Sequence, residues 1–226
     1  MDWLIETSDV RNSDGFTRAV TLARPAQNSS TKAIFCTDGQ VVPILSKFLD
    51  LGVEQEIPTL IGVHSRDDLR AQEYLHDDSG TYQQHRNFFT TSVWSWAEDQ
   101  LETKILPQDA AIFGFSNGGV FALHTGMTLR ESYSAVIALS LPPAGRLLPQ
   151  GPGRLPPIYL ACGNQGPEMK IRKNMIRLAR TLNRQGANVC LQARDASHEL
   201  RFWARELCIA IDWWNTSVDQ VDEDSY

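Results

Sequence analysis

The sequence predicts an α/β domain in which helices cover both faces of a mostly parallel, eight-stranded sheet. Short apolar runs rich in β-branched residues alternate along the chain with longer amphipathic runs, as in repeated strand and helix units. A chain of 226 residues, 42% of them hydrophobic, can also bury one core without disulfides or a structural metal. We therefore expect a single domain over residues 1–217. Residues 218–226 form a polar, acidic tail with too little apolar content to fold.

Eight runs have the composition of strands. The first two, residues 3–8 and 16–24, are expected to pair as an antiparallel hairpin where the chain enters the sheet. The other six predicted strands are residues 33–36, 59–63, 110–113, 135–139, 157–161 and 188–192.

Helical periodicity fills most of the segments between these strands. The predicted helices are residues 41–51, 82–101, 118–129, 169–185 and 200–214. The segment 140–157 is rich in Pro, Gly and Leu, and we expect it to form a loop near the mouth of the site.

Charge and hydropathy exclude several classes of partner. The formal net charge is -6 and the Lys and Arg residues are scattered, so no basic surface for a nucleic acid is expected. The amino terminus is acidic, and no run approaches the roughly 20 apolar residues that span a bilayer. These features predict a cytoplasmic protein that binds neither nucleic acid nor membrane. They leave its oligomeric state open.

The four cysteines are expected to be free, buried thiols. Cys36, Cys162 and Cys190 lie inside apolar runs, and Cys208 falls in a predicted helix. Their spacings match no zinc or CxxC pattern.

The strongest motif is Gly-Phe-Ser-Asn-Gly at residues 114–118. It follows a predicted strand and opens a predicted helix, which is the context that a GxSxG nucleophile elbow requires. Small residues two positions before and two after the serine let neighbouring backbone pass close to the sharp turn. The motif predicts an α/β-hydrolase fold with Ser116 as nucleophile. The alternative is a glycine-rich turn with no catalytic meaning.

A serine hydroxyl needs a general base, and in this fold the histidine follows the last strand. Of the five histidines only His198 occupies that position. We expect His64, His76 and His85 to lie at the surface or the rim, and His124 to pack against a neighbour in its helix.

The acid that orients the imidazole should lie between nucleophile and base in the chain. Glu168 is the first carboxylate after the predicted strand at 157–161, so it is our candidate. Asp195 is the competitor, although it stands only three residues before His198. A carboxylate near a helix start, like Glu168, is also favoured by the helix dipole without any catalytic duty.

Acyl transfer also requires donors for the developing oxyanion. One should be the backbone N–H of Asn117, which follows the nucleophile, and the second should come from the loop after the strand at 33–36. That loop reads Thr-Asp-Gly-Gln at residues 37–40. A plain turn explains the same residues without catalysis.

Four segments together resemble an esterase family of the α/β-hydrolases that includes enterochelin esterase and the mycolyltransferases. The similarity extends over about residues 33–214. The segments are Phe-Cys-Thr-Asp-Gly-Gln at 35–40, Arg-Ala-Gln-Glu-Tyr-Leu at 70–75, the elbow at 114–119, and Ser-His-Glu-Leu-Arg-Phe-Trp at 197–203. The resemblance implies that Ser116 and His198 are nucleophile and base. It also implies that Gln40 supplies the second oxyanion N–H.

The chain departs from the family pattern in two places. Ser197 stands before the terminal histidine where the family often has glycine, and Glu168 follows Gly163 at a greater distance than the family's acid usually does. Arg70 and Glu73 either belong to the substrate rim or form an ion pair that holds a loop.

These residues predict a serine esterase that acts on a small-molecule ester through an acyl-enzyme, with no metal or organic cofactor. The resemblance admits siderophore lactones, sugar-linked acyl or phenolic esters and simple carboxylic esters. An acyltransferase with the same catalytic residues, or a catalytically degenerate binding protein, is the alternative. An apolar helix face, or an aromatic wall beside the substrate, explains four aromatic residues, Phe88, Phe89, Trp94 and Trp96.

Overall fold

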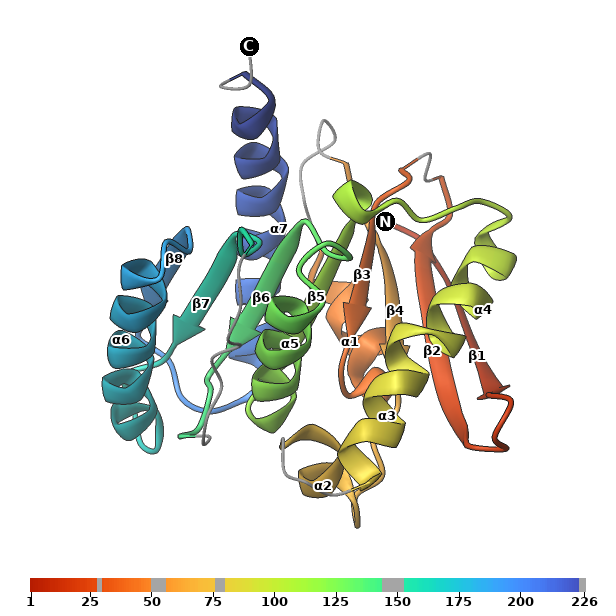
Figure 1. The fold of residues 1–226 in the computed structure, drawn as a ribbon, viewed down its shortest axis with the longest axis horizontal. Coiled ribbons are helices and arrows are strands. Elements are labelled where there is room, and N and C mark those ends of the chain that lie inside the picture. Colours follow the sequence, from red (N-terminus) through yellow and green to blue (C-terminus); the bar gives the residue numbers. More distant parts are fainter. Residues whose placement is uncertain (28–29, 50–55, 76–79, 144–152, 224–226) are drawn as a thin grey trace.

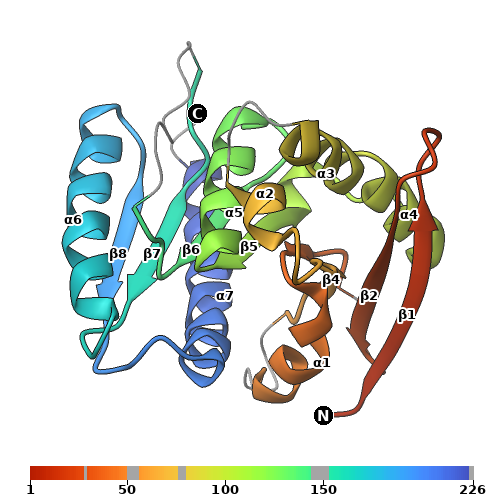
Figure 2. The same ribbon diagram turned by 90° about the horizontal axis from the view of Figure 1, so that it is seen from below.

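The computed structural model contains one eight-stranded sheet between two layers of helices (Figures 1 and 2). It describes residues 1–27, 30–49, 56–75, 80–143 and 153–223, with side chains through residue 216. In these ranges no helix is long and apolar enough to cross a membrane.

The strands follow the order β1-β2-β4-β3-β5-β6-β7-β8 across the sheet. β1 and β2 form the expected antiparallel hairpin and β2 is antiparallel to β4, whereas all later neighbours are parallel. The predicted fold class is thereby confirmed. The strand bounds are β1 Trp3–Arg11, β2 Thr17–Pro25, β3 Ala33–Cys36, β4 Thr59–Val63, β5 Ala110–Phe115, β6 Ala135–Leu139, β7 Ile158–Cys162 and β8 Val189–Ala193.

Helices cover the sheet on both sides (Figure 2). α1 (Val42–Leu45) and α7 (Leu200–Glu223) lie on one face. The other face carries α3 (Gly80–Thr90), α4 (Ser92–Leu101), α5 (Asn117–Thr128) and α6 (Glu168–Arg184). The short α2 (Arg70–Tyr74) lies beyond the carboxyl ends of the parallel strands, at the bottom of Figure 1.

The core has two halves, one on each face of the sheet. Strand residues alternate between them, so that Phe35 faces the α3–α5 side while its neighbours Ile34 and Cys36 face the α1–α7 side. The central strands β3, β4, β5, β6 and β7 are buried throughout, which explains why they read as continuous apolar runs. Because β4, β3, β5, β6, β7 and β8 are parallel, their carboxyl ends lie at one edge of the sheet, and the candidate site lies there.

The helices differ from the predicted ones in detail. The segment predicted as one helix at 41–51 is a series of short turns, with 3-10 turns at Gly39–Val41 and Ser46–Phe48 around α1, and residues 50–51 lie outside the described residues. The predicted helix at 82–101 is divided at Thr91 into α3 and α4. Of the predicted tail, residues 218–223 continue the backbone of α7, because a helix already packed on the sheet is extended at little cost.

Candidate active site

Ser116 occupies the sharp turn between β5 and α5. Its backbone adopts φ 53° and ψ -130°, a region that residues other than glycine rarely enter. The Ser116 N–H donates to the carbonyl of Leu139 at 2.9 Å, so the turn is anchored to the end of the neighbouring strand β6. The strained elbow predicted from the motif is present, and it leaves the serine partly exposed.

The two glycines of the motif are required by close backbone packing. A Cβ at Gly114 would lie 2.2 Å from the Gly118 carbonyl oxygen, and one at Gly118 would lie 2.3 Å from Thr37 Oγ1. Neither contact is sterically possible without movement of the loop after β3 or of the first turn of α5. The motif is therefore explained by geometry as well as by spacing.

His198 lies in the loop between β8 and α7 and contacts both Ser116 and Glu168. Its Nε2 is 3.2 Å from Ser116 Oγ, and its Nδ1 is 2.6 Å from Glu168 Oε1. Because a carboxylate can only accept, Nδ1 carries the proton and donates it. Nε2 of the neutral ring is then free to accept the Ser116 hydroxyl proton. This is the tautomer that a general base for serine requires.

Glu168 is the first residue of α6, and its side chain is fully buried. Its Oε2 accepts from the Gly163 N–H at 2.9 Å. Burial alone would raise the pKa of this carboxyl, but hydrogen bonds from His198, Ser140 and Gly163 outweigh burial and hold the pKa below its ordinary value. Glu168 is thus an anion in the range where histidine titrates, as the partner of an imidazole should be.

Asp195 lies elsewhere. Its Oδ1 accepts a hydrogen bond from Gln165 Nε2 at 2.8 Å, on the exposed side of the loop before His198. The same loop is also bonded to the loop after β7, since the Ala196 carbonyl accepts the N–H groups of Asn164 and Gln165, both at 3.1 Å. Of the two carboxylates that the sequence offered, Glu168 is the one on His198.

The two expected oxyanion donors belong to helical turns that begin at this edge. Asn117 is the first residue of α5, and Gln40 is in the 3-10 turn that follows Asp38. The first N–H groups of a helical turn have no partner within it and point outward with its positive dipole end. The Gln40 side chain is tied to Ser65, with Nε2 2.9 Å from Ser65 Oγ.

The loop after β3 is clamped by an ion pair. Asp38 has φ 54° and accepts Arg70 Nε at 2.7 Å and a second Arg70 nitrogen at 2.8 Å. Tyr74 holds the same residue, since its hydroxyl accepts the Asp38 N–H at 2.8 Å. Arg70 therefore holds a loop, which was one of its two expected roles, and its partner is Asp38 rather than Glu73. Glu73 pairs with Arg18 instead.

One expectation about the other histidines was wrong. His85 is fully buried instead of lying at the surface, because α3 begins at Gly80 and places it one turn from Tyr82 and Phe89 on the apolar face. His64 is half-buried and bonded to Thr21 Oγ1 at 2.8 Å. His124 contacts Tyr82, as expected. His76 lies outside the described residues.

The aromatic residues of the predicted helix at 82–101 belong to the core. Phe88 and Phe89 are fully buried, and Trp94 stacks on Phe35 with ring centroids 4.5 Å apart. The helix-packing interpretation of the aromatic residues therefore holds, and they do not form a wall beside Ser116.

The four cysteines are only in part the buried thiols that were expected. Cys36 and Cys162 are buried, while Cys190 and Cys208 are partly exposed.

Sequence reasoning missed Ser140 and Asp38. Ser140 directly follows the buried strand β6, and Asp38 stands two positions after the buried strand β3. Because the carboxyl ends of parallel strands meet at one edge, a polar residue at such a position is a candidate for the site, and this could have been read from the sequence. Both side chains are buried and both backbones are left-handed.

Comparison with known proteins identifies the family. The family model described as Putative esterase matches residues 16–220. A search of curated proteins finds no significant match.

Similar solved structures share the fold. S-formylglutathione hydrolase FrmB from Staphylococcus aureus has a TM-score of 0.74 at 12% identity, covering 94% of this chain and 96% of its own. A ferulic acid esterase has a TM-score of 0.74 at 15% identity, covering 95% and 98%. Enterochelin esterase from Shigella flexneri has a TM-score of 0.76 at 16% identity; the match covers 93% of this chain but only 58% of that protein. The fold is thus the α/β-hydrolase fold, and because the family model extends over most of its length, the chain belongs to the Putative esterase family.

Proposed function

We propose that this protein hydrolyses a carboxylic ester through an acyl-enzyme, with Ser116 as nucleophile, His198 as general base and Glu168 as the orienting acid. The observation that carries the proposal is the continuous chain of hydrogen bonds from Ser116 Oγ through both ring nitrogens of His198 to Glu168. The strained turn at Ser116 adds to it, because a serine held at φ 53° requires a reason.

The reaction follows from these contacts in two steps. Ser116 Oγ attacks the carbonyl carbon while its proton passes to His198 Nε2, and the tetrahedral intermediate then expels the alcohol, which takes that proton. Water attacks the acyl-serine next, again losing a proton to Nε2, and the acid leaves as Ser116 regains its proton. Glu168 stays ionised throughout and stabilises the imidazolium.

The backbone N–H groups of Asn117 and Gln40 are the proposed donors to the oxyanion. Both stand at the starts of helical turns at the carboxyl edge, where the first N–H groups have no partner within the turn. The Asp38–Arg70 ion pair supports this assignment, because it restrains the turn that carries Gln40. No cofactor takes part in the proposed steps.

Similar structures suggest which esters to test. These proteins include an S-formylglutathione hydrolase, a ferulic acid esterase and a siderophore hydrolase, so the panel should contain a thioester, an aryl or phenolic ester, a short-chain ester and a macrolactone. We place the protein in the cytoplasm, where free thiols such as Cys36 and Cys162 persist.

Ser116, His198 and Glu168 would equally serve acyl transfer. That activity is recognised by adding alcohol or thiol acceptors and measuring their acylation against hydrolysis.

The test combines labelling with activity. The wild-type protein should react covalently with a fluorophosphonate probe and hydrolyse at least one ester of the panel, whereas Ser116→Ala should fold normally and do neither. Ser13→Ala, in the exposed turn between β1 and β2, is the matched control and should behave as wild type. Substantial hydrolysis by a folded Ser116→Ala variant would contradict the proposal.

A further inference from the structure

Ser65 makes three hydrogen bonds to the turn that carries Gln40. It is half-buried and stands two residues after β4. Two of the bonds join it to the Gln40 side chain: Gln40 Nε2 donates to Ser65 Oγ at 2.9 Å, and the Ser65 N–H donates to Gln40 Oε1 at 3.2 Å. In the third, Ser65 Oγ lies 2.8 Å from Asp38 Oδ1. A carboxylate can only accept, so the Ser65 hydroxyl donates to Asp38 and accepts from Gln40.

The Asp38 carboxylate lies between the two turns that carry the proposed oxyanion donors. On one side Asp38 begins the 3-10 turn of Gln40, and its carbonyl accepts the Val41 N–H at 2.9 Å. On the other side its Oδ2 would lie 3.0 Å from a Cβ at Gly118, which follows Asn117 in the first turn of α5. The side chain is buried. A shift of this carboxylate would therefore move one donor relative to the other.

The negative charge of Asp38 is already balanced by Arg70, which bonds to both carboxylate oxygens. An unpaired anion at this position would oppose the second negative charge that forms on the substrate oxygen. The ion pair fixes the carboxylate alone, whereas Ser65 extends the restraint to the Gln40 side chain. Ser65 thus connects the fixed pair with the residue that carries the donor.

The backbone around Ser65 is itself well supported. The N–H of His64 donates to the carbonyl of Ala19 on β2 at 2.9 Å. The turn of Gln40 packs directly on the end of β4, since a Cβ at Gly39 would lie 2.1 Å from the Gly62 carbonyl oxygen. The Gln40 turn cannot move toward β4, and the Ser65 bonds oppose movement away from it.

We propose that Ser65 is a positioning residue of the oxyanion hole: it holds the Gln40 side chain against the Asp38 carboxylate and so keeps the Gln40 N–H where the oxyanion forms. The inference rests on the proposed function and deepens it, because it adds a residue from the loop after β4 to the site. Donors fixed in advance stabilise the tetrahedral intermediate more than the bound ester. Loss of Ser65 should therefore reduce kcat rather than raise KM.

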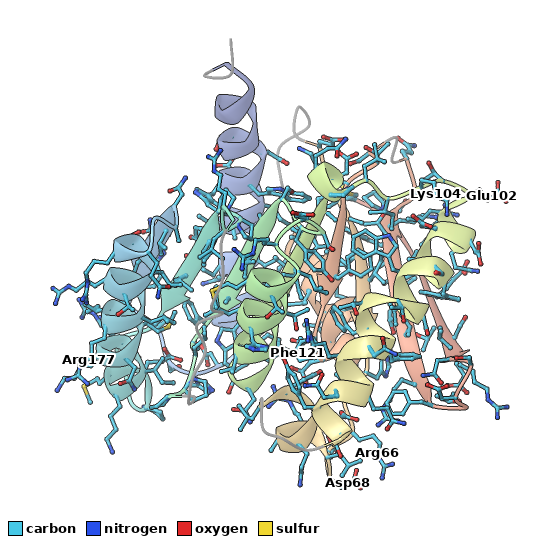
Figure 3. All side chains as sticks on the ribbon, in the orientation of Figure 1. Arg66, Asp68, Glu102, Lys104, Phe121 and Arg177 are labelled. Atoms are coloured by element: carbon cyan, nitrogen blue, oxygen red, sulfur yellow. The ribbon has the colours of Figure 1, made fainter. Side chains whose placement is uncertain are left out.

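The same loop offers a matched control. Arg66, next to Ser65, makes a two-point bond with Asp68, in which Nε is 3.0 Å from Oδ1 and Nη2 is 2.6 Å from Oδ2. Both side chains are more than half exposed, at 52% and 62%, and lie at the bottom of Figure 3. Arg66→Ala therefore removes a polar contact of this loop on its solvent side.

The experiment measures steady-state kinetics on an aryl ester of the panel. Ser65→Ala should lower kcat about tenfold with little change in KM, because a displaced oxyanion donor loses part of the roughly 10²–10³-fold that such a donor contributes. Ser65→Thr keeps the hydroxyl and should retain most of the activity, and Arg66→Ala should behave as wild type. Gln40→Ala keeps its backbone N–H and should lose less than Ser65→Ala, and the double variant should be no worse than Ser65→Ala.

Two further measurements separate positioning from general destabilisation. An aryl trifluoromethyl ketone adds to Ser116 and places its oxyanion in the hole, so its Ki for Ser65→Ala should rise by the factor by which kcat/KM falls. The second is amide hydrogen exchange at Val41, whose N–H closes the Gln40 turn. This exchange should be faster in Ser65→Ala but not in Arg66→Ala.

The inference is overturned if Ser65→Ala keeps the kcat of wild type, if its loss appears in KM instead, or if the losses of Ser65→Ala and Gln40→Ala multiply. It is equally overturned if Val41 exchanges no faster in Ser65→Ala than in Arg66→Ala. Hydrolysis retained by a folded Ser116→Ala variant would instead refute the proposed function. The exchange at Val41 requires no turnover, so it would still show whether Ser65 holds the turn.

Discussion

Acidification should destabilise this protein through one buried histidine. His85 is fully buried on α3, and its ring nitrogens have no hydrogen-bond partner among the described residues. Phe121 of α5, in the interior between α5 and α3 (Figure 3), meets the ring at a centroid distance of 5.3 Å. Burial, and secondarily the positive charge of Arg18, lower the pKa of His85 from 6.5 to about 3. Glu73 also faces the ring, with Oε1 3.9 Å from Nδ1, but its charge is engaged by Arg18.

The magnitude follows from linkage. The unfolded chain takes up a proton on His85 as the pH falls through 6.5, whereas the native protein stays neutral there until the pH approaches about 3. His85 therefore leaves the free energy of unfolding unchanged above the unfolded pKa, and that free energy decreases as the pH falls below it. At about pH 5 the free energy of unfolding should have fallen by about 2 kcal/mol relative to about pH 7. The figure is insensitive to the native pKa, because the native ring is still neutral at that pH.

The assay is urea denaturation of wild type and His85→Leu at the two pH values. The variant replaces the ring with an apolar side chain that does not titrate, so it should lose about 2 kcal/mol less stability on acidification, whatever its stability at neutral pH. In NMR spectra the His85 ring resonances of the wild type should not titrate over the same interval. Equal losses in the two proteins, or a titrating His85 ring, would show that the buried neutral imidazole is not the source.

Three other predictions concern catalysis. Glu168→Gln should keep the fold and lower kcat by up to about 10⁴-fold, and Asp195→Asn, its matched control, should cost much less; the reverse order would transfer the acid's role to Asp195. His198→Ala should be as damaging as Ser116→Ala, and the double variant should be barely worse than either, because the two act as a unit; multiplying losses would separate them. Finally, kcat/KM should rise with pH along one limb as the general base loses its proton, and a flat profile with chemistry rate-limiting would contradict a histidine base.

The strands were readable from the sequence because the central ones are buried on both faces. A run such as 135–139 has no polar face to confuse its interpretation, and the structure confirms the sheet. The division of the long predicted helix was not readable, since its apolar periodicity continues through the break. At the break, the hydroxyls of Thr90 and Thr91 donate hydrogen bonds to the backbone carbonyls of Arg86 and Asn87. The apolar pattern does not indicate these bonds.

The candidate site was predictable where it depends on local sequence or chain order. The elbow requires particular residues beside Ser116, and the order of the fold leads to His198 and Glu168. The contact between Ser140 and Trp203 is different, because it joins the end of β6 to α7 across 63 residues of sequence. Likewise, the pairing of Arg70 with Asp38 joins two loops 32 residues apart, and neither sequence indicates the other. Such partners follow from tertiary structure alone.

The direction in which α7 runs has a practical consequence for immobilising the protein. α7 starts beside His198 and rises along the back of the sheet, so Glu223 lies at the edge opposite the carboxyl ends of the strands (Figure 1). β1 also starts at that opposite edge, near Trp3. A solid support or a fused reporter attached near Glu223 or Trp3 would therefore lie at the edge opposite the candidate site. Ser116 would then face the bulk solution from which a substrate arrives.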